Sequence, residues 1–251
     1  MDFFKSEQLA ARFQYLPQTG STNTDLVALA VAKPMDFPHL SILVAGEQTA
    51  GRGRTGRVWV SPPEKSLAIS ILVRPENWTR ENFGWLPLVA GVAMSRAVKQ
   101  ALAGSSVGLK WPNDVQVSGK KVSGILSELL PDASGVVIGA GINLTLTLAE
   151  LPIPESTSLQ LEGWSGSVDD FLSSYIEQLS SLLNDFEAAT SIVRAECSTI
   201  GMTVRAIFPN ESEVIGLATG LDDGGRLLIS VPGDNQLLAV SAADIQHLRH
   251  N

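Results

Sequence analysis

The sequence predicts an α+β fold followed by a small β-barrel, and three observations point to it. Up to about residue 198, apolar runs typical of buried strands alternate with segments whose apolar residues recur at helical spacing. After Gly201 the chain changes to short strand-like segments separated by turn residues. The 251 residues, 44% of them hydrophobic, suffice for one large domain or for a medium domain with a small companion.

The first expected elements are a helix, two buried strands and a second helix. Ser21-Thr22-Asn23-Thr24 is rich in helix-capping residues, which predicts a helix over about residues 23–33. Residues 41–45 and 66–73 are apolar runs typical of buried strands. Residues 86–102 carry apolar side chains at helical spacing, so a helix packed on the sheet is expected there.

The middle of the chain predicts a series of strands. Residues 107–110 form a short expected strand, and residues 115–117 and 121–130 an expected hairpin that turns at Ser118-Gly119. Residues 136–140 predict a further strand, which leads into Gly141-Ile142-Asn143.

The last part of the chain predicts one helix and a β-unit. Residues 168–188 place large apolar side chains on one face, which predicts a single amphipathic helix. Four short strands are then expected, at residues 203–208, 213–219, 226–231 and 236–240. The predicted boundary separates residues 1–198 from a small β-domain over residues 199–251.

Composition and charge limit the class of protein. The chain has 18 basic and 26 acidic residues, and a net charge of −8 disfavours general binding to nucleic acid. Its one cysteine, Cys197, cannot form an intrachain disulfide, which fits a reducing compartment. No segment approaches the roughly 18 consecutive apolar residues of a membrane helix, and the N-terminus lacks a secretory pattern. We expect a cytoplasmic protein.

The most informative motif is the loop over residues 51–59, where three arginines alternate with three glycines and Trp59 ends the run. Arginine offers planar donors for phosphate or carboxylate, and an indole offers a surface on which a ring can stack. The spacing also spells G-x-G-x-x-G, but the residues that follow are a poor helix start, which disfavours a dinucleotide fold. A plain solvated loop is the alternative interpretation.

A second cluster, Lys110-Trp111-Pro112-Asn113-Asp114, lies about fifty residues further on and is followed by Gly119-Lys120-Lys121. Taken singly, these residues would most often be strand-end packing, an Asx turn and a solvated charge. Their occurrence together with the arginine loop indicates an enzyme that handles a nucleotide.

These motifs resemble the signature set of the biotin–protein ligases. The resemblance rests on residues 51–59, residues 110–114 with 121–124, residues 139–143, and Ser21-Thr22-Asn23 upstream. It extends from about Leu16 to Arg249 and implies a mixed-sheet, biotin/lipoate-ligase-like catalytic domain over residues 1–198. Residues 199–251 would then be an SH3-like β-domain. Only about twenty residues precede Ser21, so we expect the monofunctional type without an N-terminal DNA-binding domain.

The resemblance implies a two-step reaction. Biotin and ATP, with Mg²⁺, would form biotinyl-5′-AMP and pyrophosphate, and the biotinyl group would pass to one lysine of a biotin carboxyl carrier domain. Two anions meet in the first step, so the site should be rich in fixed positive charge. The expected partner is a biotin-dependent carboxylase, with neither DNA nor membrane, and the expected state is a monomer or a ligand-linked homodimer.

The resemblance also assigns roles to residues. Those implied for biotin are Ser21, Thr22, Asn23, Gln48, Gly51, Arg52 and Gly124. Those implied for the nucleotide are Arg54, Arg57, Trp59, Asn113, Lys121 and Asn143. Arg54 and Lys121 would act on the carboxylate and phosphoryl group, and Asp114 would orient the acceptor lysine or take its proton. No residue is assigned to a metal.

Two other functions remain open at this point. One is a ligase of the same fold that attaches lipoate or octanoate, and the other is a biotin or nucleotide sensor without catalysis. Lys121 and the three loop arginines favour a ligase, because a sensor would need the pocket residues Ser21, Thr22 and Gln48 but none of the phosphate-binding charges.

Overall fold

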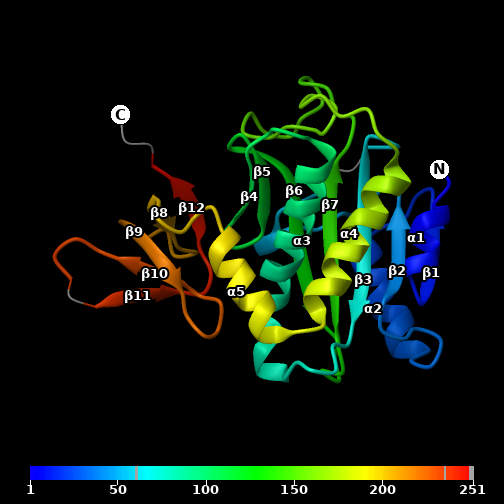
Figure 1. Ribbon diagram of the computed structural model, residues 1–251, viewed down its shortest axis with the longest axis horizontal. Coiled ribbons are helices and arrows are strands. Elements are labelled where there is room, and N and C mark those ends of the chain that lie inside the picture. Colours follow the sequence, from blue (N-terminus) through cyan, green and yellow to red (C-terminus); the bar gives the residue numbers. More distant parts are fainter. Residues whose placement is uncertain (60–61, 235, 249–251) are drawn as a thin grey trace.

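The structure is a computed structural model that describes residues 1–59, 62–234 and 236–248. Two predicted features lie partly outside the described residues. They are the non-helical exit of the arginine loop, at residues 60–61, and the end of the predicted β-domain, at residues 249–251. Within the described part, a seven-stranded mixed sheet packed with helices is joined to a five-stranded antiparallel sheet (Figure 1). The predicted α+β class is confirmed.

The large sheet has the strand order β1-β2-β3-β7-β6-β5-β4 in the described residues. Its strands are β1 (Arg12–Leu16), β2 (Ser41–Ala45), β3 (Ser66–Val73), β4 (Val107–Lys110), β5 (Asp114–Val117), β6 (Lys120–Leu129) and β7 (Val136–Asn143). β1 and β2 are parallel, and every other neighbouring pair is antiparallel. β2 and β3 are buried along their whole lengths, which explains why they read as unbroken apolar runs.

Helices cover the two faces of this sheet unequally. α3 (Leu86–Ala101) and α4 (Val168–Leu183) lie on one face and pack on each other (Figure 1). α1 (Phe4–Leu9) packs against α4. α5 (Phe186–Glu196) packs against both α3 and α4. α2 (Thr22–Ala32) lies on the other face, against β2, β3 and β7. The face over β6 and β5 is thereby left for the site described below.

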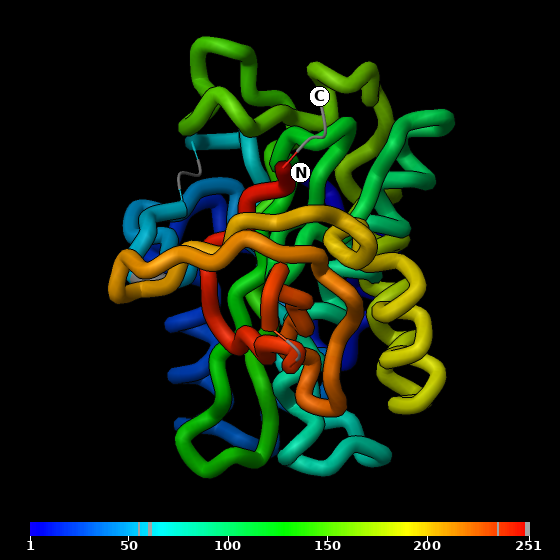
Figure 2. Tube along the Cα trace, turned by 90° about the vertical axis from the view of Figure 1, so that its left-hand side faces the viewer, coloured from blue at the N-terminus to red at the C-terminus, as the bar shows by residue number. Residues whose placement is uncertain are grey.

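The second sheet consists of β8 (Thr203–Ile207), β9 (Glu213–Leu221), β10 (Leu227–Ser230), β11 (Leu237–Val240) and β12 (Asp244–His247), in the order β11-β10-β9-β8-β12. It lies at the β4 end of the large sheet, in front of it in Figure 2 and coloured orange to red. Buried apolar side chains of both sheets belong to one continuous core.

Two tryptophans from the part of the chain that carries the large sheet fix the turn between β9 and β10. The Trp85 indole N–H donates to the Asp223 carbonyl at 2.8 Å, and the Trp111 indole N–H donates to the Gly225 carbonyl at 3.0 Å. Both indoles are almost fully buried. A buried hydrogen bond of this kind is costly to break, so the second sheet is docked firmly.

Most of the predicted elements are present. α2, α3 and the strands of the large sheet from β2 onwards lie within a few residues of their predicted ends, and the β5–β6 hairpin turns at Ser118-Gly119. Both turn residues have positive φ, 51° and 82°, which is the backbone of a type I′ turn. No described helix is long and apolar enough to cross a membrane.

The predicted single helix over residues 168–188 is wrong. α4 ends at Leu183, and α5 begins at Phe186 after a short break. Asp185 causes the break, because its carboxylate accepts a hydrogen bond from the Ala188 amide at 3.0 Å and so caps a new helix. The sequence-based prediction also lacked α1, β1 and β12.

Candidate active site

A cavity of about 830 Å³ lies on the face of the large sheet that α2 leaves uncovered, and the second sheet closes one side of it. Nearly all of the residues proposed from the motifs line it: Ser21, Thr22, Asn23, Gln48, Arg52, Arg54, Arg57, Trp59, Asn113, Asp114, Lys121, Gly124 and Asn143. Gly51 does not line the cavity; it is buried, and a Cβ there would lie 2.4 Å from the Trp59 carbonyl oxygen. Segments more than one hundred residues apart thus meet at one place.

The floor of the cavity is a row of residues in register across five strands. Ala68, Gly141, Gly124, Asp114 and Lys110 are successive partners from β3 through β7, β6 and β5 to β4. Paired residues in a sheet point to the same face. The row therefore changes from small and apolar at β3 to charged at β4.

Two glycines of this row make room for Trp59. A Cβ at Gly141 would lie 2.2 Å from the Trp59 ring, and a Cβ at Gly124 would lie 3.3 Å from it. The indole therefore rests directly on the backbone of β6 and β7, and its buried N–H has no hydrogen-bond partner among the described residues. The predicted flat apolar surface is present at this position.

The arginine loop is folded back on itself beside Trp59. Arg52 and Val58 form an antiparallel bridge, and the Trp59 amide donates to the Gly51 carbonyl at 3.0 Å. Gly56 has a φ of 77°, a conformation that favours glycine. The loop is closed by backbone hydrogen bonds, so its side chains are free to point outwards.

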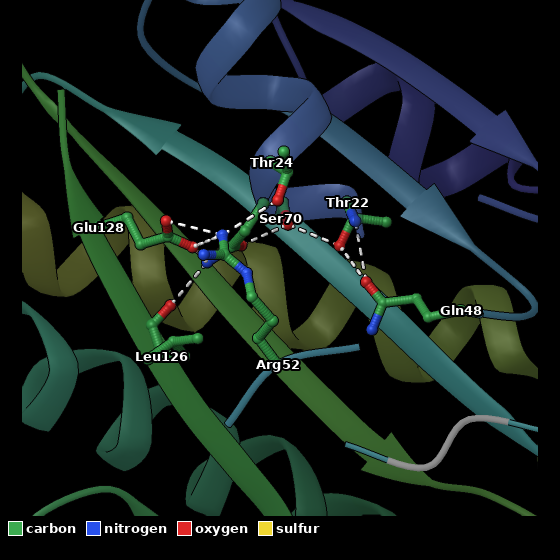
Figure 3. Close-up of polar contacts among 8 residues, drawn as sticks. Thr22, Thr24, Gln48, Arg52, Ser70, Leu126 and Glu128 are labelled. Atoms are coloured by element: carbon green, nitrogen blue, oxygen red, sulfur yellow. Dashed lines mark hydrogen bonds and ion pairs between the residues drawn. The ribbon is translucent and has the colours of Figure 1, made fainter. Parts of the chain in front are cut away.

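The three loop arginines reach different parts of the fold. Arg52 donates to Glu128 on β6 at 2.8 Å and to Thr24 on α2 at 3.0 Å (Figure 3). Arg54 donates to the Asn113 side chain at 3.1 Å, and Arg57 forms an ion pair with Asp244 on β12. The loop therefore contacts α2, the large sheet and the second sheet at once.

Positive charge is concentrated at the centre of the cavity. The Lys121 ammonium lies 2.6 Å from the Asp114 carboxylate and 5.9 Å from the centre of the Trp59 ring. Burial lowers the pKa of Arg54 and of Lys110, and Lys121 and Arg57 lower the pKa of Lys110 further. Four cations, Arg54, Arg57, Lys110 and Lys121, thus lie near two carboxylates, Asp114 and Asp244, in a partly desolvated space, and this excess of positive charge suits an anionic ligand.

The opposite end of the cavity is lined by hydroxyl and amide groups, with Arg52 and its partner Glu128 beside them. The Thr22 amide donates to the Gln48 side-chain oxygen at 2.8 Å, and the Thr22 hydroxyl lies 2.7 Å from that of Ser70 (Figure 3). Ser21 is the N-cap of α2, but its hydroxyl caps no backbone amide. The cavity thus joins a pocket of hydroxyl and amide groups to a cluster of cations.

The two asparagines proposed for the nucleotide are held by backbone carbonyls. The Asn113 amide donates to Ile125 and the Asn143 amide to Thr157, each at 2.9 Å. Their orientation is therefore fixed before any ligand arrives.

Several residues in or beside the cavity were not assigned a role from the sequence; four of them are Ser70, Lys110, Glu128 and Asp244. Lys110 is the first residue of the recognised motif over residues 110–114, so the sequence could have indicated that it belongs to the site. The other three come from strands whose neighbours in space are far away in sequence, and no local pattern marks them.

Comparisons with known proteins agree with this geometry. Residues 15–143 match the Biotin/lipoate A/B protein ligase family. The chain is 38% identical over 239 residues to the biotin–[acetyl-CoA-carboxylase] ligase of Mycobacterium tuberculosis, covering 92% of this chain and 87% of that protein. It is 34% identical to the bifunctional ligase/repressor BirA of Escherichia coli, covering 76% of this chain and 61% of that protein.

A solved structure gives the same result. The biotin protein ligase from Aquifex aeolicus in complex with biotin and ATP superposes with a TM-score of 0.77 at 28% identity, covering 95% of this chain and 100% of that one. The family match spans half of this chain, and the Mycobacterium tuberculosis relative is matched over most of its length. The chain therefore belongs to the biotin/lipoate A/B protein ligase family and, within it, to the biotin–protein ligases.

Proposed function

We propose that this protein uses ATP to attach biotin to a lysine of a biotin carboxyl carrier domain, through biotinyl-5′-AMP. The observation that carries this function is the arrangement of the cavity. A pocket of hydroxyl and amide groups lies at one end, a cluster of cations lies at the other, and Trp59 rests on two glycines between them. An acid with a polar head fits one end and a nucleotide the other.

In the first step the biotin carboxylate attacks the α-phosphorus of ATP and pyrophosphate leaves. Both reactants are anions, so the reaction needs fixed positive charge at the point where they meet. Arg54 and Lys121 are the proposed groups, because both are partly buried and lie beside Trp59 or Asn113. Ser21, Thr22, Asn23, Gln48, Arg52 and Gly124 are proposed to surround biotin, with Gly51 shaping the loop.

The nucleotide is proposed to occupy the remainder of the cavity. Trp59, Asn113 and Asn143 would contact the base, and Arg57 and Lys121 the phosphates. The described residues contain no group of three or more His, Cys, Asp or Glu side chains that could hold a metal. We propose that Mg²⁺ is bound together with the nucleotide phosphates.

In the second step the acceptor lysine attacks the biotinyl carbonyl carbon and AMP leaves. The attacking amine must lose a proton, and Asp114 is the proposed group that orients it or accepts that proton. Asp114 is held by Lys121 in the structure, so the ammonium of an acceptor lysine would compete with Lys121 for the same carboxylate.

The remaining features of the function are proposals of the same kind. We propose a division into a catalytic domain over residues 1–198 and an SH3-like β-domain over residues 199–251, supported by the separate five-stranded antiparallel sheet. We also propose a cytoplasmic location, no DNA partner, and a monomer or ligand-linked homodimer.

The test is pyrophosphate release from ATP with biotin, lipoate or octanoate, each with and without an apo carrier domain. Release that requires biotin, together with a carrier mass increased by one biotinyl group, would support the proposal. Release with lipoate or octanoate alone would change the substrate. Biotin binding without any release would indicate a sensor.

A further inference from the structure

The connection between β7 and α4 places a short extra strand beside Lys121 (yellow-green at the top of Figure 1). Ser156 forms a parallel bridge with Lys121, so residues 155–157 (the strap) run alongside the start of β6. The Lys121 amide donates to the Glu155 carbonyl at 2.7 Å, and the Thr157 amide donates to the Lys121 carbonyl at 2.8 Å. Both backbone groups of Lys121 are therefore bound by the strap.

The large sheet is irregular where Lys121 lies. The register between β5 and β6 shifts between Val115 and Gln116, and Gln116 is the residue paired with Lys121. Such a bulge disrupts the ladder of backbone hydrogen bonds and changes the direction of the side chains beside it. The strap supplies backbone hydrogen bonds at this irregular point, so it contributes to where the Lys121 side chain is directed.

Thr157 binds three different parts of the chain with its three hydrogen-bonding groups. Besides its amide contact with Lys121, its carbonyl accepts the Asn143 side-chain amide at 2.9 Å. Its hydroxyl donates to the Glu162 carboxylate at 2.6 Å. Thr157 is 2% exposed, and neither Thr157 nor Glu162 lines the cavity. One buried residue thus joins the residue proposed for the phosphoryl group to a residue proposed for the base.

The bond between Thr157 and Glu162 closes the chain around this junction. The Leu159 amide donates to the Asn143 carbonyl at 3.0 Å, and the Glu162 amide donates to the carbonyls of Ser158 and Leu159, each at 3.2 Å. A hydrogen bond to a carboxylate is stronger than one between neutral groups. The Glu162 side chain therefore fixes Thr157 from outside the cavity.

We infer that Thr157 and Glu162 are positioning residues for the first step, which hold Lys121 and Asn143 at a fixed separation. The phosphoryl group and the base of ATP would then be bound in register with each other. This inference rests on the proposed function and deepens it. Loss of the Thr157 contact should affect turnover and ATP binding but not biotin binding, because the hydroxyl and amide groups at the opposite end of the cavity are held by other contacts.

The experiment measures biotin-dependent pyrophosphate release at varied ATP and varied biotin for the wild type, Thr157→Val and Thr157→Ser. Valine has nearly the shape of threonine but cannot donate to Glu162, whereas serine keeps the hydroxyl. Thr147→Val is the matched control, because the Thr147 hydroxyl also donates to a glutamate of the same connection, Glu150, at 2.9 Å, and Thr147 is exposed and does not line the cavity.

In Thr157→Val the displaced charge should lower kcat by about tenfold to 10²-fold, and the displaced Asn143 should raise the KM for ATP by about tenfold. The KM for biotin should not change. Thr157→Ser and Thr147→Val should both stay close to the wild type in all three constants. A merely structural role of Thr157 would lower the melting temperature and leave the constants of the folded enzyme unchanged.

A second comparison tests whether Thr157 acts through Lys121. In the Lys121→Ala background the charge that Thr157 positions is absent, so Thr157→Val should lower kcat there by no more than about twofold. A loss of kcat as large as in the wild-type background would overturn the inference.

Unchanged kcat and KM for ATP in folded Thr157→Val, with an active wild type, would also overturn the inference and leave the proposed function intact. If Thr157→Val does not fold, variants of the half-buried Glu162 decide. Glu162→Ala should show the same losses, and Glu162→Gln, which keeps an oxygen acceptor, should not; wild-type constants in Glu162→Ala would overturn the inference. A wild type that releases no pyrophosphate with biotin and ATP would instead refute the proposed function, and the inference with it.

Discussion

At the scale of single residues, Lys121 is held by Asp114 and by the face of Trp59, and about a quarter of its side chain is exposed. Lys121→Ala should reduce biotin-dependent pyrophosphate release by about 10²–10³-fold, because it removes a fixed charge from the reacting phosphoryl group. The melting temperature should change little. Lys120→Ala is the matched control, since Lys120 is exposed and does not line the cavity; similar rates in the two variants would contradict the assignment.

Gly141 is the second position where one residue decides the geometry of the site. A Cβ there would overlap the Trp59 ring, and the indole can move more easily than the sheet can. Gly141→Ala should therefore raise the KM for ATP by about tenfold to 10²-fold with a small effect on unfolding. Steady-state kinetics with varied ATP measure this, and Gly220→Ala, where a Cβ meets nothing within 4 Å, is the control. An unaltered KM would mean that Trp59 does not position the nucleotide.

The residues of the site differ in how far the sequence could reveal them. Those in continuous motifs, such as Arg54, Asn113 and Lys121, could be singled out from the sequence, and the structure places them in one cavity. Ser70 and Glu128 were not proposed, because their relation to Asn23 arises only when β3, β6 and α2 come together. Asn23 was proposed as a biotin contact; it lines the cavity, and its side chain is hydrogen-bonded to Leu126, Glu128 and Ser70.

At the scale of elements, the break between α4 and α5 depends on Asp185. Asp185→Ala removes the hydrogen bond to Ala188 and a negative charge at a helix start, which should lower the free energy of unfolding by about 1 kcal/mol. Ser167→Ala at the start of α4 should cost less, because its bond to Asp170 is longer, at 3.4 Å. Urea unfolding measures both, with activity unchanged. If the two substitutions lower the free energy of unfolding equally, the length of the capping hydrogen bond does not determine its contribution to stability.

The elements that the sequence missed have two physical causes. α1 has six residues and β12 four, which is too short for a periodic pattern to stand out. α5 was absorbed into the preceding helix, because the apolar spacing continues across the break and only the capping role of Asp185 separates the two. Long, strongly periodic elements such as α3 were predicted almost to the residue.

At the scale of the whole molecule, the junction between the two sheets contains a histidine that is held neutral. The Trp111 amide donates to the Thr199 hydroxyl at 3.0 Å, and the same hydroxyl forms a hydrogen bond with the His247 ring nitrogen, also at 3.0 Å. Burial, followed by the charge of Lys110, lowers the pKa of His247 to about 4. Burial also lowers the pKa of His39, whose ring nitrogen accepts the Arg74 amide.

This histidine makes stability depend on pH. In the unfolded chain His247 is protonated below its ordinary pKa of about 6.5, whereas in the folded chain it is protonated only below about pH 4. The free energy of unfolding should therefore fall by about 2–3 kcal/mol as the pH is lowered from 6.5 to 4, with His39 adding in the same direction. Urea unfolding across this range tests it. His247→Gln, which does not titrate, should show a smaller slope, and an equal slope would contradict the prediction.

The two indole hydrogen bonds that dock the turn between β9 and β10 have a consequence for hydrogen exchange. The indole protons of Trp85 and Trp111 can exchange with solvent only when the turn lifts away from the large sheet. The exchange rates of these two indole protons, measured by nuclear magnetic resonance in deuterated water, would thus report how often the two sheets separate. If the two indole signals decay as slowly as the slowest backbone amides of β3 and β7, the sheets part only in global unfolding; faster decay would reveal a separate opening of the second sheet.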